Sequence, residues 1–165
     1  MFYLSSPTGG SRYTRGMTSS DPARTPQAQA LDLVTRYYAA FNAGDAAGML
    51  GLLTDDVQHD INEGETQRGL EPFRAFLAKM DAHYRERASD LVVMATPDGT
   101  RAAAEFVIHG EYLQTDPGLP EARGQTYVLP VGAFFELRGD KIARVTNYYN
   151  LAEWTRQVSA GAEHA

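Results

Sequence analysis

Apolar residues in the first half of the chain recur at helical spacing. Between Ala30 and Phe41 they lie three or four positions apart, which is the pattern of an amphipathic helix. Thr25 can cap this helix, and Pro26 suits its first turn because that position needs no backbone donor. Gly44 is a natural stop for it. The pattern therefore predicts a helix from about residue 26 to residue 43.

Two further helices are predicted in this half. The first is short and presents its apolar residues between 46 and 53 on one face. Residues 54–69 are polar and irregular, so we expect no core strand there. The second helix begins near Glu71 and Pro72. Its stripe consists of Phe73, Phe76, Leu77, Met80 and Tyr84.

The second half changes to the alternation that is typical of strands. Four segments have this pattern: 91–96, 101–112, 125–137 and 141–149. Turns at 97–99 and 138–140 join neighbours, and residues 116–124 read as a loop with two prolines and two glycines. Pro130 and Gly132 inside a strand suggest a bulge or the close approach of another group. Residues 151–158 form a short amphipathic end.

Helices followed by turn-linked strands predict an α+β domain, with three N-terminal helices on one face of a curved antiparallel sheet of about four strands. A curved sheet that faces helices leaves a cavity at its wide end. Residues 1–25 lack periodicity and are expected to form a flexible tail before a domain over 26–160. Met17 offers an alternative start of translation.

Charge and cysteine content narrow the classes of partner. The 165 residues carry a formal net charge of −6 with no basic cluster, so we expect no nucleic-acid partner. The absence of cysteine excludes thiolate chemistry and fits a cytoplasmic location. No apolar run is long enough for a membrane, and the first residues do not look like a secretory signal.

Several sequence stretches carry a family resemblance. RYYAAFNAGD at 36–45, LLTDD at 52–56 and HD at 59–60 resemble the ketosteroid isomerases and the wider NTF2-like, or SnoaL-like, superfamily. EFVIHGEY at 105–112, GQTYVLPVGAFFEL at 124–137 and KIARVTNYYNLAEW at 141–154 resemble a bacterial group of ketosteroid isomerase-related proteins. The resemblance covers about residues 28–158 and implies an NTF2-like cone.

The resemblance also implies catalytic roles, residue by residue. Tyr37 stands where the isomerases have the tyrosine that donates to the substrate oxyanion. Asp60 stands where they have the base, if one loop residue is deleted; otherwise Ile61 falls there. The third group, a protonated strand aspartate, is replaced by Gly132. In the isomerases these three groups act together as a base with a two-donor oxyanion hole.

Other candidate residues depend on which strand face lines the cavity. In the isomerase register Glu105 and His109 point inward, and His109 replaces the missing acid; the alternation alone instead places Phe106 and Ile108 in the core. The same register turns one face of the last two strands to the substrate. The alternative is that this face forms a dimer surface. Its members are Asn147, Tyr149, Gly132 and Phe134.

Two functional hypotheses follow. One is a cofactor-free isomerase, cyclase or hydratase that acts by proton transfer on a small apolar carbonyl compound, with Asp60 as base and with Tyr37 and His109 as catalytic partners. The other is a non-catalytic domain that binds a ligand or a partner chain. We expect no metal, because His59, Asp60 and His109 do not match a metal-ligand spacing. We also expect a homodimer through the sheet, with Thr146, Tyr148 and Asn150 facing the second copy.

Overall fold

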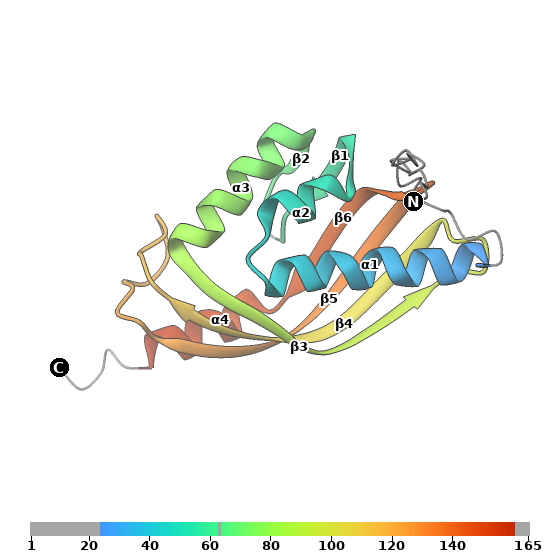
Figure 1. Ribbon diagram of the computed structural model, residues 1–165. Helices are drawn as coiled ribbons and strands as arrows, with labels where there is room; N and C mark the ends of the chain where they lie inside the picture. The colour runs from blue at the N-terminus through green and yellow to red at the C-terminus, as the bar shows by residue number, and fades with distance from the viewer. Residues whose placement is uncertain (1–23, 63, 161–165) are drawn as a thin grey trace, which may run out of the picture.

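Four helices and six strands make up the computed structural model, which describes residues 24–62 and 64–160 (Figure 1). The helices are α1 (Pro26–Asn42), α2 (Ala46–Gly51), α3 (Leu70–His83) and α4 (Leu151–Ser159). The strands are β1 (Leu53–Asp60), β2 (Thr66–Arg68), β3 (Tyr84–Ala95), β4 (Arg101–Tyr112), β5 (Thr126–Arg138) and β6 (Lys141–Tyr149). Nearly all of the predicted tail, including Met17, lies outside the described residues.

Helix α1 begins and ends as its sequence predicts. The Thr25 side chain accepts a hydrogen bond from the Ala28 backbone N–H, and Pro26 occupies the first turn. After the helix, Gly44 has a φ of 65°, a left-handed conformation that glycine adopts without strain. The predicted boundaries of this helix are confirmed.

All six strands form one sheet in the order β2-β1-β6-β5-β4-β3. Strands β3 to β6 pair antiparallel, as predicted, but β1 pairs parallel with β6 and antiparallel with the short β2. The prediction of an irregular segment over 54–69 is therefore wrong, and so is the count of about four strands. Strand β1 buries Val57 and His59 on one face and leaves polar residues on the other, so it needs few apolar residues.

Strand β3 starts seven residues earlier than predicted. It follows α3 directly at Tyr84, and its first part reads YRERASD, which has little apolar signal. The inward positions of this part are Tyr84, Glu86 and Ala88. Two of the three are polar, which is why hydrophobic alternation does not reveal the strand.

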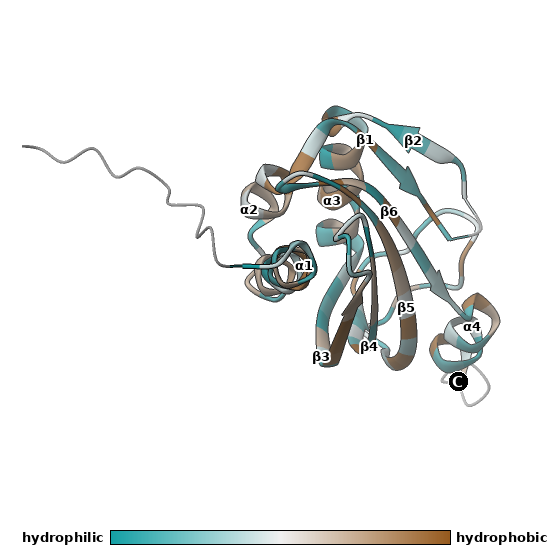
Figure 2. Cartoon of the chain, turned by 90° about the vertical axis from the view of Figure 1, so that its right-hand side faces the viewer, coloured by the Kyte–Doolittle hydropathy of each residue, from teal (hydrophilic) through white to brown (hydrophobic). Residues whose placement is uncertain are grey.

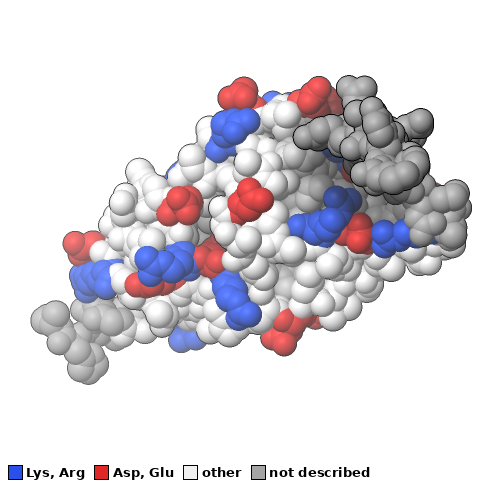
Figure 3. Space-filling view, in the orientation of Figure 1, with Lys and Arg blue, Asp and Glu red and all other residues white. Residues whose placement is uncertain are grey.

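The sheet curves around one side of the molecule, and α1, α2 and α3 lie against its concave face (Figures 1 and 2). Residues on β4 and β5 alternate strictly: the even-numbered members of β4 and the odd-numbered members of β5 are buried against the helices. Only the even-numbered residues of β4 and the odd-numbered residues of β5 can therefore reach a cavity inside the cone. On the face seen in Figure 3, acidic and basic side chains are interspersed.

The bulge expected near Pro130 and Gly132 is absent from the described pairing. Strands β4 and β5 stay in register from Arg101 to Glu111, and a Cβ added at Gly132 would meet nothing within 4 Å. Pro130 is tolerated because it lies beyond the last β5–β6 pair, Val131 with Tyr149, where β5 has only β4 beside it.

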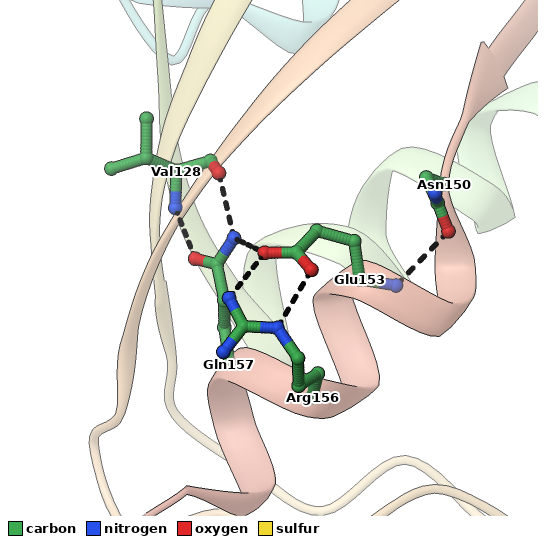
Figure 4. Close-up of polar contacts among 5 residues, drawn as sticks. All are labelled: Val128, Asn150, Glu153, Arg156 and Gln157. Carbon is green, nitrogen blue, oxygen red and sulfur yellow. Dashed lines mark hydrogen bonds and ion pairs between the residues drawn. The ribbon is translucent and has the colours of Figure 1, made fainter.

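Helix α4 takes the place of the missing neighbour of β5 (Figure 4). The Gln157 side-chain amide accepts from the Val128 N–H at 2.8 Å and donates to the Val128 carbonyl oxygen at 2.9 Å. Asn150 caps the helix by accepting from the Glu153 N–H. These bonds fix α4 across the end of the sheet, where Trp154 packs against Tyr112.

Candidate active site

A cavity of about 370 Å³ lies between the concave face of the sheet and the helices. Most of its wall is apolar or aromatic, contributed by all four helices and by strands β3 to β6 together with His59 of β1. This volume lies within the range of small-molecule pockets. The polar side chains of the wall include those of Tyr37, His59, Glu86, Tyr127 and Asn147.

A carboxyl–phenol pair forms part of this wall. Glu86 of β3, Gly110 of β4 and Tyr127 of β5 stand in one row across the sheet. The Tyr127 hydroxyl donates to Glu86 Oε1 at 2.6 Å, so its ring must cross over β4. A Cβ at Gly110 would lie 2.1 Å from Tyr127 Cζ. Glycine is therefore required at this position for the two side chains to meet.

The surroundings of the pair favour uncharged groups. Burial raises the pKa of the Glu86 carboxyl, and the hydrogen bond from Tyr127 opposes this only in part. Burial and the neighbouring Glu86 raise the pKa of Tyr127, which stays a neutral donor. A carboxyl with a raised pKa in an apolar cavity is suited to general acid–base catalysis near neutral pH.

Tyr37 of α1 also faces this cavity, as predicted. Its ring contacts Tyr38 and Phe135 edge-on, with centroids 5.5 and 5.9 Å away. Burial raises its pKa, and none of the described residues hydrogen-bonds its hydroxyl. Tyr37 is thus a neutral phenol whose donor is available to a ligand.

His59 of β1 lines the cavity and packs against α3. Its ring stacks on Phe73 and meets Phe76 edge-on, each at 4.5 Å between centroids. The side chain is only 2% exposed, and Nδ1 is buried with no hydrogen-bond partner. Burial lowers the pKa of His59 to about 4, although the Asp60 carboxylate acts in the opposite direction. The imidazole is therefore neutral at physiological pH.

A polar cluster closes the rim near the loop over 113–125. Asp116 accepts from Lys79 Nζ at 2.9 Å and from the Tyr84 hydroxyl at 3.2 Å, and its backbone N–H donates to the Tyr112 hydroxyl. These contacts hold the loop against α3 and β3, and they place Leu119 in the cavity wall.

Sequence and structure comparisons agree on the family. The model of the SnoaL-like domain matches residues 34–145. The chain belongs to the SnoaL-like family.

Three solved relatives, each named a "putative polyketide cyclase", share the fold of this SnoaL-like chain. The one from Pseudomonas putida KT2440 is 62% identical, with a TM-score of 0.77 over 78% of this chain and 97% of that one. The one from Xanthomonas campestris pv. campestris is 53% identical, with a TM-score of 0.80 over 82% and 100%. The one from Silicibacter sp. TM1040 is 55% identical, with a TM-score of 0.78 over 79% and 96%. No curated protein matches the chain.

The SnoaL-like cavity does not include Asp60. The prediction that Asp60 lies in a loop at the pocket mouth is wrong. Asp60 is the last residue of β1, and its side chain lies on the face opposite to that of His59. Thr146, Gln58 and Thr66 donate to its carboxylate at 2.7, 2.9 and 2.9 Å. Burial would raise the pKa of Asp60, but these three donors together with the charge of Arg144 outweigh burial, and the pKa is lowered. Its position gives no support to a role as the base.

Glu105 and His109 also lie outside the cavity, and their predicted inward register is wrong. Phe106 and Ile108 occupy the cavity wall instead, because burying these apolar side chains is favourable and alternation then turns their neighbours outward. On the outer face, His109 Nε2 lies 3.1 Å from Ser89 Oγ.

The remaining candidate residues lie on β5 and β6, and only those on β6 face the cavity. Asn147 and Tyr149 line the cavity, as predicted. Gly132 and Phe134 do not: the inward residues of this part of β5 are odd-numbered, and Phe134 is 49% exposed on the outer face, where its ring contacts Tyr148. The predicted inward face of β5 is therefore wrong, and Gly132 and Phe134 lie outside the cavity.

Three polar cavity residues escape prediction from the sequence: Glu86, His59 and Tyr127. Glu86 lies before residue 91, where the alternation predicts no strand, and the spacing of His59 raises only the question of a metal. One signal is present: Gly110 interrupts an otherwise continuous strand, which indicates that another group approaches closely.

Metal ions and membranes receive no support from the described part of the chain. Within residues 24–62 and 64–160, no group of three His, Cys, Asp or Glu side chains could hold a metal ion. None of the described helices is long and apolar enough to cross a membrane.

Proposed function

We propose that this chain is an enzyme that moves a proton beside the carbonyl of a small, mostly apolar compound, in an isomerisation or a cyclisation. The observation that carries the proposal is the Glu86–Tyr127 pair, a carboxyl with a raised pKa inside an apolar cavity. Glu86 takes the role that sequence reasoning gives to Asp60.

The proposed step uses side chains alone. The ionised Glu86 carboxylate accepts a proton from the carbon next to the carbonyl, while Tyr37 donates a hydrogen bond to the oxygen, which becomes an enolate. Tyr127 holds Glu86 in place. The proton then returns to another carbon in an isomerisation. In a cyclisation the enolate carbon attacks a second carbonyl of the same molecule, and the proton goes to the new alkoxide.

The names of the relatives support this reaction class. Three proteins more than 50% identical to this chain carry the name "putative polyketide cyclase". At that level of identity the fold and most of the cavity wall are expected to be shared. Fold alone would not be sufficient, since one fold hosts many functions.

Hydrogen exchange tests the step without knowledge of the natural substrate. In D₂O the enzyme should exchange the protons beside the carbonyl of 1-tetralone, measured by proton NMR, faster than buffer does. Glu86→Gln, which can still accept from Tyr127, should lower that rate at least 100-fold. Tyr37→Phe should lower it by about 100-fold through loss of the oxyanion donor.

Asp60→Asn is the matched control, since it removes a carboxylate outside the cavity, and it should exchange at the wild-type rate. The wild-type rate should also rise with pH through a pKa above the ordinary Glu value, because the base must be ionised. Exchange that persists in Glu86→Gln, or that disappears in Asp60→Asn, would refute the assignment of the base.

A non-catalytic ligand-binding role is the second candidate. It is favoured by Gly132, which stands at the position of the isomerases' strand acid and faces away from the cavity. Binding of 1-tetralone without exchange above the buffer rate would support this role against the enzyme.

We further propose a homodimer through the outer face of the sheet. Two neighbouring rows carry apolar side chains there: Val92 and Tyr148 in one, Met94 and Phe134 in the next, each about half exposed. Such a patch is typical of a protein interface. Light scattering at about 10 µM should give a dimer mass for the wild type and a monomer mass for Phe134→Glu. A monomeric wild type would reject this partner.

A further inference from the structure

His59 presents a polar group to the cavity that the protein itself does not satisfy. The side chain is almost completely buried, and Nδ1 has no hydrogen-bond partner. The imidazole stacks on Phe73 and meets Phe76 edge-on. Phenylalanine would fill the same space between Phe73 and Phe76 without leaving a buried nitrogen unpaired. A polar residue in this place therefore needs an explanation beyond packing.

The buried nitrogen indicates which tautomer is present. A neutral imidazole carries one proton, on either Nδ1 or Nε2. A sealed N–H without an acceptor is rarer in proteins than a sealed acceptor without a donor. Nδ1 is the sealed atom, so the proton belongs on Nε2, the nitrogen that is not sealed and can reach the cavity. His59 is thus an uncharged donor.

The position of His59 separates it from the Glu86–Tyr127 pair. In the sheet order, β1 lies on one side of the β6-β5-β4 centre and β3 lies on the other. Glu86 and Tyr127 belong to the β3–β5 wall, while His59 belongs to the wall made by β1 and α3. The cavity therefore has His59 on one side of the centre of the sheet and the Glu86–Tyr127 pair on the other.

We propose that His59 donates its Nε2–H to a second oxygen of the ligand. The ligand class is then a compound with an apolar, ring-containing body and oxygen functions at two ends, one of them the carbonyl whose neighbouring carbon loses a proton. This inference rests on the proposed function for the role of the first oxygen.

Two pairs of probes test the second oxygen. The pairs are 1-tetralone with 6-hydroxy-1-tetralone, and androst-4-en-3-one with androst-4-ene-3,17-dione; within each pair, the second compound adds an oxygen at the far end. Dissociation constants are measured by calorimetry. We expect the added oxygen to strengthen binding to the wild type at least tenfold in one of the pairs, the pair whose length matches the cavity.

Three variants separate donation from packing. His59→Phe keeps the aromatic stack and should lose the tenfold gain while binding the one-oxygen probe as before. His59→Gln places an amide nitrogen near the position of Nε2 and should restore most of the gain. His59→Asn places it near Nδ1 and should not. A role in packing alone would leave the gain the same in all of them.

The outcomes also separate this inference from the proposed function. A tenfold gain that survives in His59→Phe, or no gain in either pair, overturns the inference even if Glu86→Gln abolishes exchange. A gain that His59→Phe removes supports the inference even if no exchange is found, and then only the catalytic step fails.

Discussion

Acidification should destabilise the folded protein, and His59 should account for a definable part of the loss. The pKa of His59 is lowered from 6.5 to about 4 because burial disfavours the charged ring. In the unfolded chain the ring binds a proton near pH 6.5, while in the folded chain it does so only near pH 4. The stabilising contribution is therefore fully present above pH 6.5 and is lost as the pH falls through about 4.

The size of this contribution follows from the two pKa values. Each unit of difference corresponds to about 1.4 kcal/mol, so the free energy of unfolding should fall by about 3 kcal/mol from this group between pH 7.5 and pH 4. His59→Phe cannot bind the proton and should lack this part of the loss. Carboxyl groups that titrate below pH 5 contribute equally to both proteins and cancel in the difference.

The assay is urea unfolding followed by circular dichroism at pH 7.5, 6.5, 5.5 and 4.5. The difference in unfolding free energy between His59→Phe and the wild type should grow steadily below pH 6.5, in favour of the variant. His59→Gln, which also does not titrate in this range, should show the same trend if the effect belongs to the imidazole. Parallel curves for all three proteins would show that His59 is not held neutral by burial.

Three further predictions concern positions that support the site. Gly110→Ala should lower the free energy of unfolding by about 1–3 kcal/mol, because the new Cβ overlaps the ring of Tyr127. Gly132→Ala in the same sheet should change stability little. Equal effects of the two variants in thermal melts would refute the passage of the Tyr127 ring over β4. Asp60→Ala should lower stability by about 1 kcal/mol at pH 7, measured in urea, through lost hydrogen bonds. Asn42→Ala should lower the free energy of unfolding by about 1–3 kcal/mol, because the Asn42 amide hydrogen-bonds both the N–H and the carbonyl oxygen of buried Ala88 on β3. An unchanged melting temperature would contradict this.

Elements with strong periodicity are predictable from the sequence, and elements with polar inward faces are not. The predicted bounds of helix α1 and of strands β4, β5 and β6 agree with the structure to within about one or two residues, since each element buries a regular set of apolar side chains. Strand β1 and the first half of β3 bury His59, Tyr84 and Glu86 in the positions where alternation expects apolar residues. The cavity wall itself thus conceals these strands from a hydrophobic pattern.

The residues of the candidate site are likewise predictable from the sequence only in part. The family resemblance and the register of the last strand place Tyr37, Asn147 and Tyr149 in the cavity correctly. The same reasoning places Glu105 and His109 there wrongly, although the alternation of β4 points the other way and is right. A shift of one residue reverses a strand face, so the burial of apolar side chains on β4 is a better guide to register than a matching motif in a relative.

Glu86 and His59, which sequence reasoning does not find, share one energetic property: each makes the folded protein by itself less stable than a simpler side chain would. Glu86 holds a carboxyl where burial penalises its charge, and His59 buries a nitrogen without a partner. For Glu86, the raised pKa means that its contribution to stability is lost as the pH rises, so Glu86→Gln should not be less stable than the wild type at neutral pH. Residues that weaken the fold in this way are expected where a ligand supplies the missing interactions. Glu86 and His59 line the same cavity. This is a physical argument for a binding site there, and it does not depend on any relative.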